Sequence, residues 1–117
     1  MKILEERRSH REEVINEAKE WAMNLPFKAS VILIGSYARG DFNEWSDVDV
    51  VLISELTGSP LDRLKKINYP AEYEVIPLTL VEFMRMLRKK NPIAVEAVER
   101  GIILRDDFNI EKLRKQS

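Results

Sequence analysis

The sequence predicts an α/β (α+β) fold in which helices pack on a small mixed β-sheet. Two observations lead to this fold class. Segments with apolar residues at helical spacing are interleaved with short runs that are β-branched or alternate in polarity. The chain has only 117 residues, which suits one domain spanning 1–117. The order of the strands in the sheet is left open by the sequence.

The first third of the chain predicts a long helix, a buried strand and a turn. Apolar residues recur every three or four positions over 3–25, which is typical of an amphipathic helix, and Pro26 marks its end. Residues 29–34 form an apolar run rich in β-branched side chains, as in a buried strand. Gly35 ends that run, and a helix-compatible turn over 37–39 follows.

The rest of the chain continues the alternation of strands and helices. Ser59 and Asn91 are N-cap residues followed by proline, and Thr79 forms a capping box with Glu82. Gly101 is expected to end the helix before the last strand. The expected elements are strands over 47–53, 72–78 and 102–104, helices over 59–67, from 79 and over 91–100, and a weak helix from 110.

The composition argues against several classes of protein. Nineteen basic and twenty acidic residues give a net charge of −1, so the sequence carries no strong nucleic-acid signal. No apolar run approaches the roughly 18 residues that cross a bilayer, and the N-terminus is charged too early for a signal peptide. The chain has no cysteine for a disulfide or a thiolate metal site. We therefore expect a cytoplasmic protein without membrane contact.

Two aspartates are the first candidates for a functional site. Asp47 and Asp49 are two apart on a predicted strand, so both side chains leave the same face, with Cα atoms about 6.5 to 7 Å apart. The valines at 48 and 50 fix this strand in the core, and the two carboxylates repel each other. Mg²⁺ relieves such repulsion and fills its remaining positions with water and phosphate oxygens. Taken alone, an Asp-x-Asp motif on an exposed strand face is more often only solvated charge.

A glycine-serine pair follows the first predicted strand directly. Gly35 allows a sharp turn and a close approach of phosphate, and the free N–H groups that follow, with the Ser36 hydroxyl, form a seat for an anion. Arg39 lies one helical turn further on, where it can approach the phosphates. The alternative for Arg39 is an exposed ion pair with Asp41 or Glu44. If the two strands are neighbours, the turn and the aspartates face the same ligand.

Together these motifs resemble the signature of the polymerase-beta-like nucleotidyltransferase superfamily. The resemblance covers the 16 residues from Gly35 to Val50, as Gly-Ser, ten residues and then Asp-Val-Asp. The fuller pattern Gly-Ser-x-Ala-Arg-Gly…Ser-Asp-Val-Asp is similar to the minimal, single-domain branch with MntA-like antitoxins. The resemblance implies that Asp47 and Asp49 hold Mg²⁺, as two ions with bound nucleotide, and that Gly35 and Ser36 contact the phosphates.

The same resemblance implies a third carboxylate on the strand over 72–78, which completes the metal site and helps to activate the attacking hydroxyl. Glu74 and the two apolar residues after it match the family pattern, with Glu in place of Asp. By the alternation of side chains along a strand, Glu72 is expected to point to the same face as Glu74, and it is the alternative third carboxylate. A longer side chain displaces the carboxylate by about 1 Å, and such a displacement can cost roughly 100-fold in rate. Nucleotide binding is thus better supported than catalysis.

The resemblance implies a nucleotidyltransferase that moves a nucleoside monophosphate, with AMP from ATP as the expected case, to a hydroxyl acceptor. The alternative is an antitoxin-type interaction protein that binds and neutralises a HEPN-class partner, with or without adenylylating it. Few residues remain for an acceptor pocket in 117 residues, so that partner or a second copy is expected to complete the site. The sequence identifies neither the acceptor nor the preferred base.

Other conspicuous residues are expected to have no catalytic role. His10 is the only histidine and lies in a charged part of the first helix, so it is expected to be exposed. The basic run over 85–90 is typical of a solvated helix end. The acidic pair 106–107 indicates a turn. Trp45, in the loop before the aspartates, is left open as a residue that can stack on a base.

Overall fold

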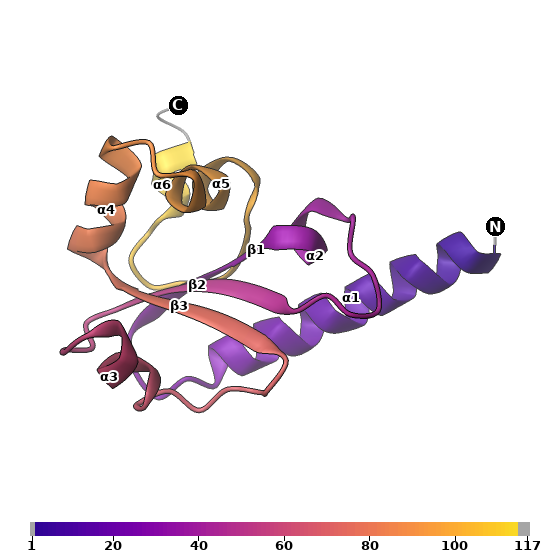
Figure 1. Ribbon diagram of the computed structural model, residues 1–117, viewed down its shortest axis with the longest axis horizontal. Helices are drawn as coiled ribbons and strands as arrows, with labels where there is room; N and C mark the ends of the chain where they lie inside the picture. Colours follow the sequence, from indigo (N-terminus) through magenta and orange to yellow (C-terminus); the bar gives the residue numbers. More distant parts are fainter. Residues whose placement is uncertain (1, 115–117) are drawn as a thin grey trace.

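The computed structural model describes residues 2–114, and it shows a four-stranded mixed sheet with helices on both faces (Figure 1). In chain order the elements are α1 (Lys2–Met23), β1 (Ala29–Ile34), α2 (Gly35–Arg39), β2 (Val48–Ser54), α3 (Pro60–Leu64), β3 (Tyr73–Thr79), α4 (Leu80–Arg88), α5 (Pro92–Arg100), β4 (Ile102–Asp106) and α6 (Glu111–Arg114). The predicted α/β class and element order are confirmed, with boundaries shifted by a few residues. One shift concerns the site, because β2 begins after Asp47 rather than at it.

The strand order, which the sequence left open, is β3-β2-β1-β4. β1 is antiparallel to both of its neighbours, and β2 runs parallel to β3. In this register Asp49 of β2 lies opposite Ile34 on one side and opposite Glu74 on the other. The end of β1 and the starts of β2 and β3 therefore meet at one edge of the sheet.

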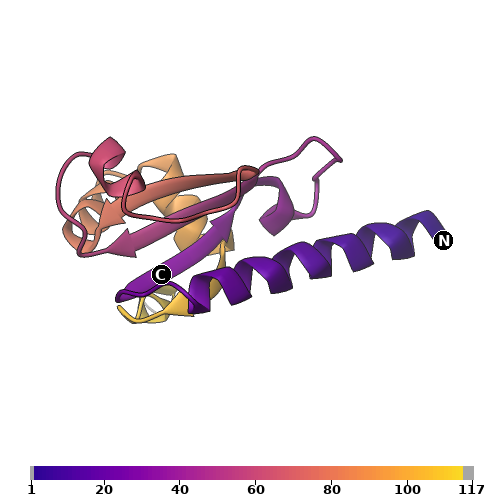
Figure 2. The same cartoon turned by 90° about the horizontal axis from the view of Figure 1, so that it is seen from below.

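Alternating side chains of the strands fill two separate cores, one on each face of the sheet. On one face, Val31 and Val50 lie in a core with Ala18 and Ala22 of α1. On the other face, the apolar residues of β1 and β2 pack against α4, α5 and α6, with Phe83 fully buried. Figures 1 and 2 show the sheet between α1 and the α4–α6 layer. Both faces of the sheet are thus covered by helices, as expected for this fold class.

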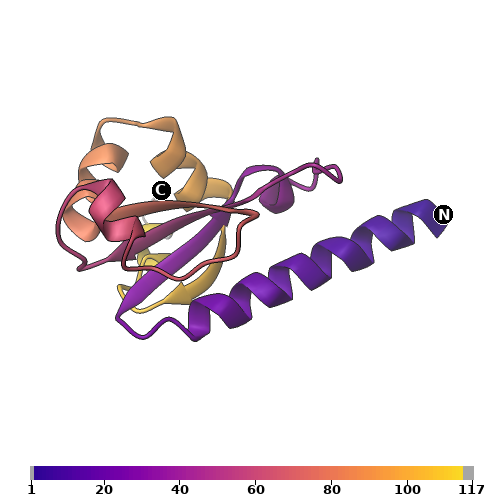
Figure 3. The ribbon, with the colours of Figure 1, turned by 60° about the horizontal axis from the view of Figure 1, so that its bottom comes forward.

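Only the C-terminal half of α1 belongs to the core. Its N-terminal half extends beyond the sheet (Figures 2 and 3), and Ile3 and Leu4 are 72% and 63% exposed. Leu4, which belongs to the predicted amphipathic pattern over 3–25, therefore lies outside the core, and the buried face of α1 is shorter than that pattern. Polar contacts hold the middle of this helix instead, since Arg11 donates to the carbonyls of Tyr37 (2.7 Å) and Ala38 (2.9 Å). Among the described helices, none is both long and apolar enough to span a bilayer.

Gly101 ends α5, as expected, but the reason for glycine there is packing rather than backbone conformation. Its φ of −69° is open to any residue. A Cβ at this position would overlap the side chain of Ile32 and would lie 2.6 Å from the carbonyl oxygen of Ala97. The glycine therefore lets the end of α5 approach β1 closely, which fixes α5 over the edge of the sheet that carries Asp49.

Replacing Gly101 by alanine should destabilise the protein, because the added methyl group has no space. We expect Gly101→Ala to lower the free energy of unfolding by about 2 kcal/mol. Gly40→Ala is the matched control, since Gly40 has a φ of 92° and no atom within 4 Å of a Cβ. There only the left-handed backbone opposes alanine, at about 1 kcal/mol. Urea denaturation compares the two, and an equal or smaller loss for Gly101→Ala would contradict the close packing.

Candidate active site

The residues singled out by the sequence come together where β1 ends and where β2 and β3 begin. Asp49 is half-buried between Ile34 and Glu74 on the neighbouring strands. Asp47 lies just before β2, and both Asp47 and Glu74 are exposed. The edge of the sheet thus presents three carboxylates, of which one is withdrawn toward the core.

Gly35 links the phosphate motif to the acidic motif physically. It follows the last residue of β1 with a φ of +76°, a backbone conformation that favours glycine. A Cβ built on Gly35 would also overlap Oδ2 of Asp49. Glycine therefore meets two requirements here, the turn itself and room for a carboxylate against its α-carbon. The expected closeness of the turn and the acidic motif is present in the structure at Asp49.

Asp49 occupies an unfavourable electrostatic environment. Its Oδ1 is buried and has no hydrogen-bond partner among the described residues. Burial raises the pKa of Asp49 from 3.8 to about 6, with further contributions from a hydrogen bond to Glu74 and the charges of Glu74, Asp47 and Glu96. A buried oxygen that lacks a donor is available to a cation. The fold thus holds a carboxylate here at a cost in stability.

Glu96 of α5 is a site residue that the sequence did not reveal. Its Oε2 accepts a hydrogen bond from the backbone N–H of Gly35 at 2.8 Å and one from Nη1 of Arg39 at 3.3 Å. The N–H of Gly35 is therefore already bound to a carboxylate, and the seat for an anion on the N–H groups after it stays a prediction. The two residues are 61 positions apart, and no local pattern connects them. The helical register of α5 gives no indication of this contact either, because the buried side of the helix carries Ala94, Ala97 and Val98 and Glu96 lies on a different side.

Arg39 takes part in an exposed ion pair, which was one of the two alternatives. Its Nε lies 3.2 Å from Oδ2 of Asp41, and its side chain is 40% exposed. The hydrogen bond and charge of Asp41, followed by Glu96, raise the pKa of Arg39. Glu96 is thus a second partner in place of the expected alternative Glu44. Contact of Arg39 with phosphates stays a prediction.

The structure distinguishes the two candidates for the third carboxylate. Glu74 lies opposite Asp49 in the parallel ladder, and its charge is one of those that raise the pKa of Asp49. Glu72 precedes β3, so strand parity does not apply to it. It borders a hollow of about 270 Å³ beneath α1, together with Tyr73 and Glu17. The expectation that Glu72 points the same way as Glu74 is therefore wrong, and the catalytic role of Glu74 stays a prediction.

A hard cation suits the carboxylate oxygens at this edge, although they do not form a complete cage. Within residues 2–114, no three Asp, Glu, His or Cys side chains are arranged as a ready metal site. Mg²⁺ commonly takes one or two carboxylates and completes its shell with water and phosphate oxygens. Asp47 and Asp49 would hold it, with Glu74 beside them. The lone Oδ1 of Asp49 is the observation in favour of this fit.

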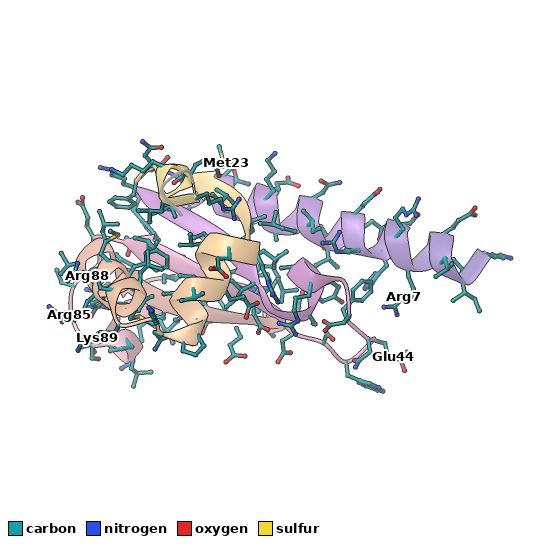
Figure 4. The ribbon with its side chains drawn as sticks, turned by 90° about the horizontal axis from the view of Figure 1, so that it is seen from above. Arg7, Met23, Glu44, Arg85, Arg88 and Lys89 are labelled. Atoms are coloured by element: carbon teal, nitrogen blue, oxygen red, sulfur yellow. The ribbon has the colours of Figure 1, made fainter. Side chains whose placement is uncertain are left out.

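Residues outside the site largely follow the sequence expectations. His10 is exposed, and its Nε2 lies 3.1 Å from the hydroxyl of Tyr37. Trp45 is 84% exposed in the loop before β2. Figure 4 shows Arg85, Arg88 and Lys89 together at the end of the molecule opposite Arg7 and Glu44, as expected for a solvated helix end. Asp106 ends β4, and the expected turn follows it.

Comparison with known proteins gives a family, a relative and a solved structure. The family model of a nucleotidyltransferase domain matches residues 6–112. A Methanocaldococcus jannaschii protein named "putative protein adenylyltransferase" is 42% identical over 45 residues, which cover 38% of this chain and 46% of that protein. The chain thus matches less than half of that relative's length. The crystal structure of a "putative nucleotidyltransferase" from Sulfolobus solfataricus is similar with a TM-score of 0.53. The match covers 86% of this chain and 83% of that chain at 20% sequence identity, so it shows a similar fold.

Neutralising Asp49 should stabilise the protein in the absence of ligand. Because the folded-state pKa is raised from 3.8 to about 6, the ionised carboxylate destabilises the fold above pH 6, and this cost is lost as the pH falls below 3.8. The shift alone corresponds to about 3 kcal/mol, but partial exposure screens it. We expect Asp49→Asn to raise the free energy of unfolding at pH 7.5 by about 1 kcal/mol.

Urea denaturation at pH 7.5 and at pH 4 measures this effect. The gain should shrink strongly at the lower pH, where the wild-type carboxylate is protonated in the folded state and close to its titration midpoint in the unfolded state. Asp47→Asn should be neutral or slightly stabilising, because it removes a like charge near Asp49. Glu55→Gln, at an exposed position after β2, is the control for removal of a negative charge. A clear loss of stability in Asp49→Asn at pH 7.5 would show that this carboxylate is structural.

Proposed function

The chain belongs to the nucleotidyltransferase domain family, and from this premise we propose that it transfers a nucleoside monophosphate, with AMP from ATP as the expected case, to a hydroxyl acceptor. The observation that carries the proposal is the contact between Asp49 and the α-carbon of Gly35. It joins the phosphate turn and the acidic motif into one site, where a triphosphate on the turn would lie beside the carboxylates.

Each part of the site has a defined task in this reaction. The acceptor oxygen attacks the α-phosphorus, its bond to the proton breaks, and pyrophosphate leaves. Mg²⁺ held by Asp47 and Asp49, as two ions with bound nucleotide, would supply charge neutralisation of the phosphates and a lowered pKa of the acceptor hydroxyl. Glu74, exposed beside Asp49, would accept the proton of that hydroxyl. Gly35 and Ser36 hold the phosphates through the turn, and most of the rate comes from this positioning.

The alternative function is that of an antitoxin-type protein which binds and neutralises a HEPN-class partner, with or without adenylylating it. The projecting half of α1, where Ile3 and Leu4 are exposed, favours a protein partner or a second copy. The name of the Methanocaldococcus relative also supports a protein as acceptor. Incubation with α-labelled ATP and Mg²⁺ separates the cases: label on the partner supports transfer, and a tight unlabelled complex supports binding alone.

Nucleotide binding should depend on both aspartates and on Mg²⁺. We expect calorimetric titration with ATP to detect binding in the presence of Mg²⁺, and Asp47→Asn and Asp49→Asn each to weaken it by at least about tenfold, the loss of one charge-assisted contact. Glu44→Gln is the matched control, since it removes a charge from the same exposed loop. Unchanged affinity in both aspartate variants, with the fold intact, would overturn the proposed function.

Glu74 and Glu72 form a matched pair for testing the third carboxylate. The readout is Mn²⁺ affinity in the presence of a non-hydrolysable ATP analogue, followed by electron paramagnetic resonance. Glu74→Gln should weaken binding about tenfold, because its carboxylate lies against Asp49. Glu72→Gln should leave the affinity unchanged, because Glu72 borders the hollow beneath α1. The opposite order of effects would assign the third position to Glu72.

A further inference from the structure

Glu96 binds two hydrogen-bond donors that the proposed function assigns to the phosphates of the nucleotide. Its carboxylate accepts from the N–H of Gly35 at 2.8 Å and pairs with Arg39 at 3.3 Å. The N-cap of α2 is Ile34, which offers no side-chain acceptor to the helix. A carboxylate from a different helix therefore takes the place that an anionic ligand would occupy. Because it carries the same charge as such a ligand, it competes with the ligand for these donors.

Negative charge accumulates around this contact. The charges of Asp47, Glu74 and Glu96 all act on Asp49. Arg39 is a cation in contact with Glu96, and Asp41 shares it. A free triphosphate entering this region meets repulsion from the carboxylates and must also separate Glu96 from its donors. A cation bound to the triphosphate reduces the first of these costs.

We propose that Glu96 is a specificity-determining residue, which holds the phosphate turn as an internal anion and restricts it to metal-complexed polyphosphates. The inference rests on the proposed function. Without ligand, Glu96 satisfies the N–H of Gly35 and orders Arg39. When a magnesium-complexed nucleotide binds, a phosphate oxygen replaces the carboxylate at Gly35, and Arg39 becomes available to the phosphates. Free nucleotide, with higher net charge, displaces Glu96 less well.

The surroundings of Glu96 allow this exchange. Its side chain is 27% exposed, and that of Arg39 is 40% exposed, so the ion pair between them is a weak, solvated one. The backbone of α5 is fixed by the close packing at Gly101, which leaves rotation of the Glu96 side chain as the available movement. Displacement thus requires one side chain to turn toward solvent, and the helix stays in place.

The test compares ATP affinity with Mg²⁺ and with EDTA for wild type, Glu96→Gln and Glu96→Ala, measured by calorimetry. Removal of one negative charge should tighten metal-free ATP binding by about tenfold and magnesium-ATP binding by about threefold. Discrimination between the two forms of ATP therefore falls. Glu99→Gln, an exposed charge change on the same helix, should reproduce the wild type.

Weaker or unchanged ATP binding in both Glu96 variants, while wild type binds magnesium-ATP, would overturn this inference alone, because Glu96 would then only support the turn. If no variant and no wild-type sample binds ATP in either form, the proposed function fails and this inference with it. Wild-type protein provides a check that is independent of variant folding. On addition of magnesium-ATP, the Gly35 amide and the Glu96 carboxyl carbon should shift together in nuclear magnetic resonance spectra, and a shift at Gly35 with none at Glu96 would contradict displacement.

Discussion

The carboxylate of Asp49, held against the α-carbon of Gly35, is the contact on which the rest of the site depends. It exists only because Gly35 lacks a side chain and because β1 and β2 are paired with Ile34 opposite Asp49. The contact leaves one carboxylate oxygen buried without a donor and raises the pKa of the group. Such an arrangement opposes folding in the free protein, and a cation with a phosphate ligand would relieve it. We therefore interpret it as an arrangement maintained for binding.

The surrounding elements keep this unfavourable group in place. The parallel pairing of β2 with β3 sets Glu74 beside Asp49, and the close packing of Gly101 sets α5 above the same edge. From the other face, Arg11 of α1 binds the carbonyls at the end of α2 and so fixes the segment that follows the turn. Three layers of the fold thus converge on a single turn, and both cores contribute to its rigidity.

The sequence predicted the elements and the local motifs well, because periodicity, caps and glycine positions act over a few residues. Thr79 with Glu82, for example, forms the expected capping box. Contacts between residues far apart in the sequence could not be predicted. The contact of Glu96 with Gly35 joins residues 61 positions apart, and it depends on the packing of α5, which no local pattern encodes. Glu72 was misplaced because strand parity fails one residue before a strand begins. Leu4 was misplaced because amphipathic spacing does not show where the sheet ends beneath a helix.

The central claim is that the turn at Gly35 and the carboxylate of Asp49 bind one metal-complexed nucleotide together. A crystal structure of the protein with Mg²⁺ and a non-hydrolysable ATP analogue tests this claim most directly. We predict a phosphate oxygen on the N–H of Gly35, a metal ion on Oδ1 of Asp49, and Glu96 turned away from both. A nucleotide bound elsewhere, or bound with Asp49 free of metal and Glu96 still on Gly35, would contradict it.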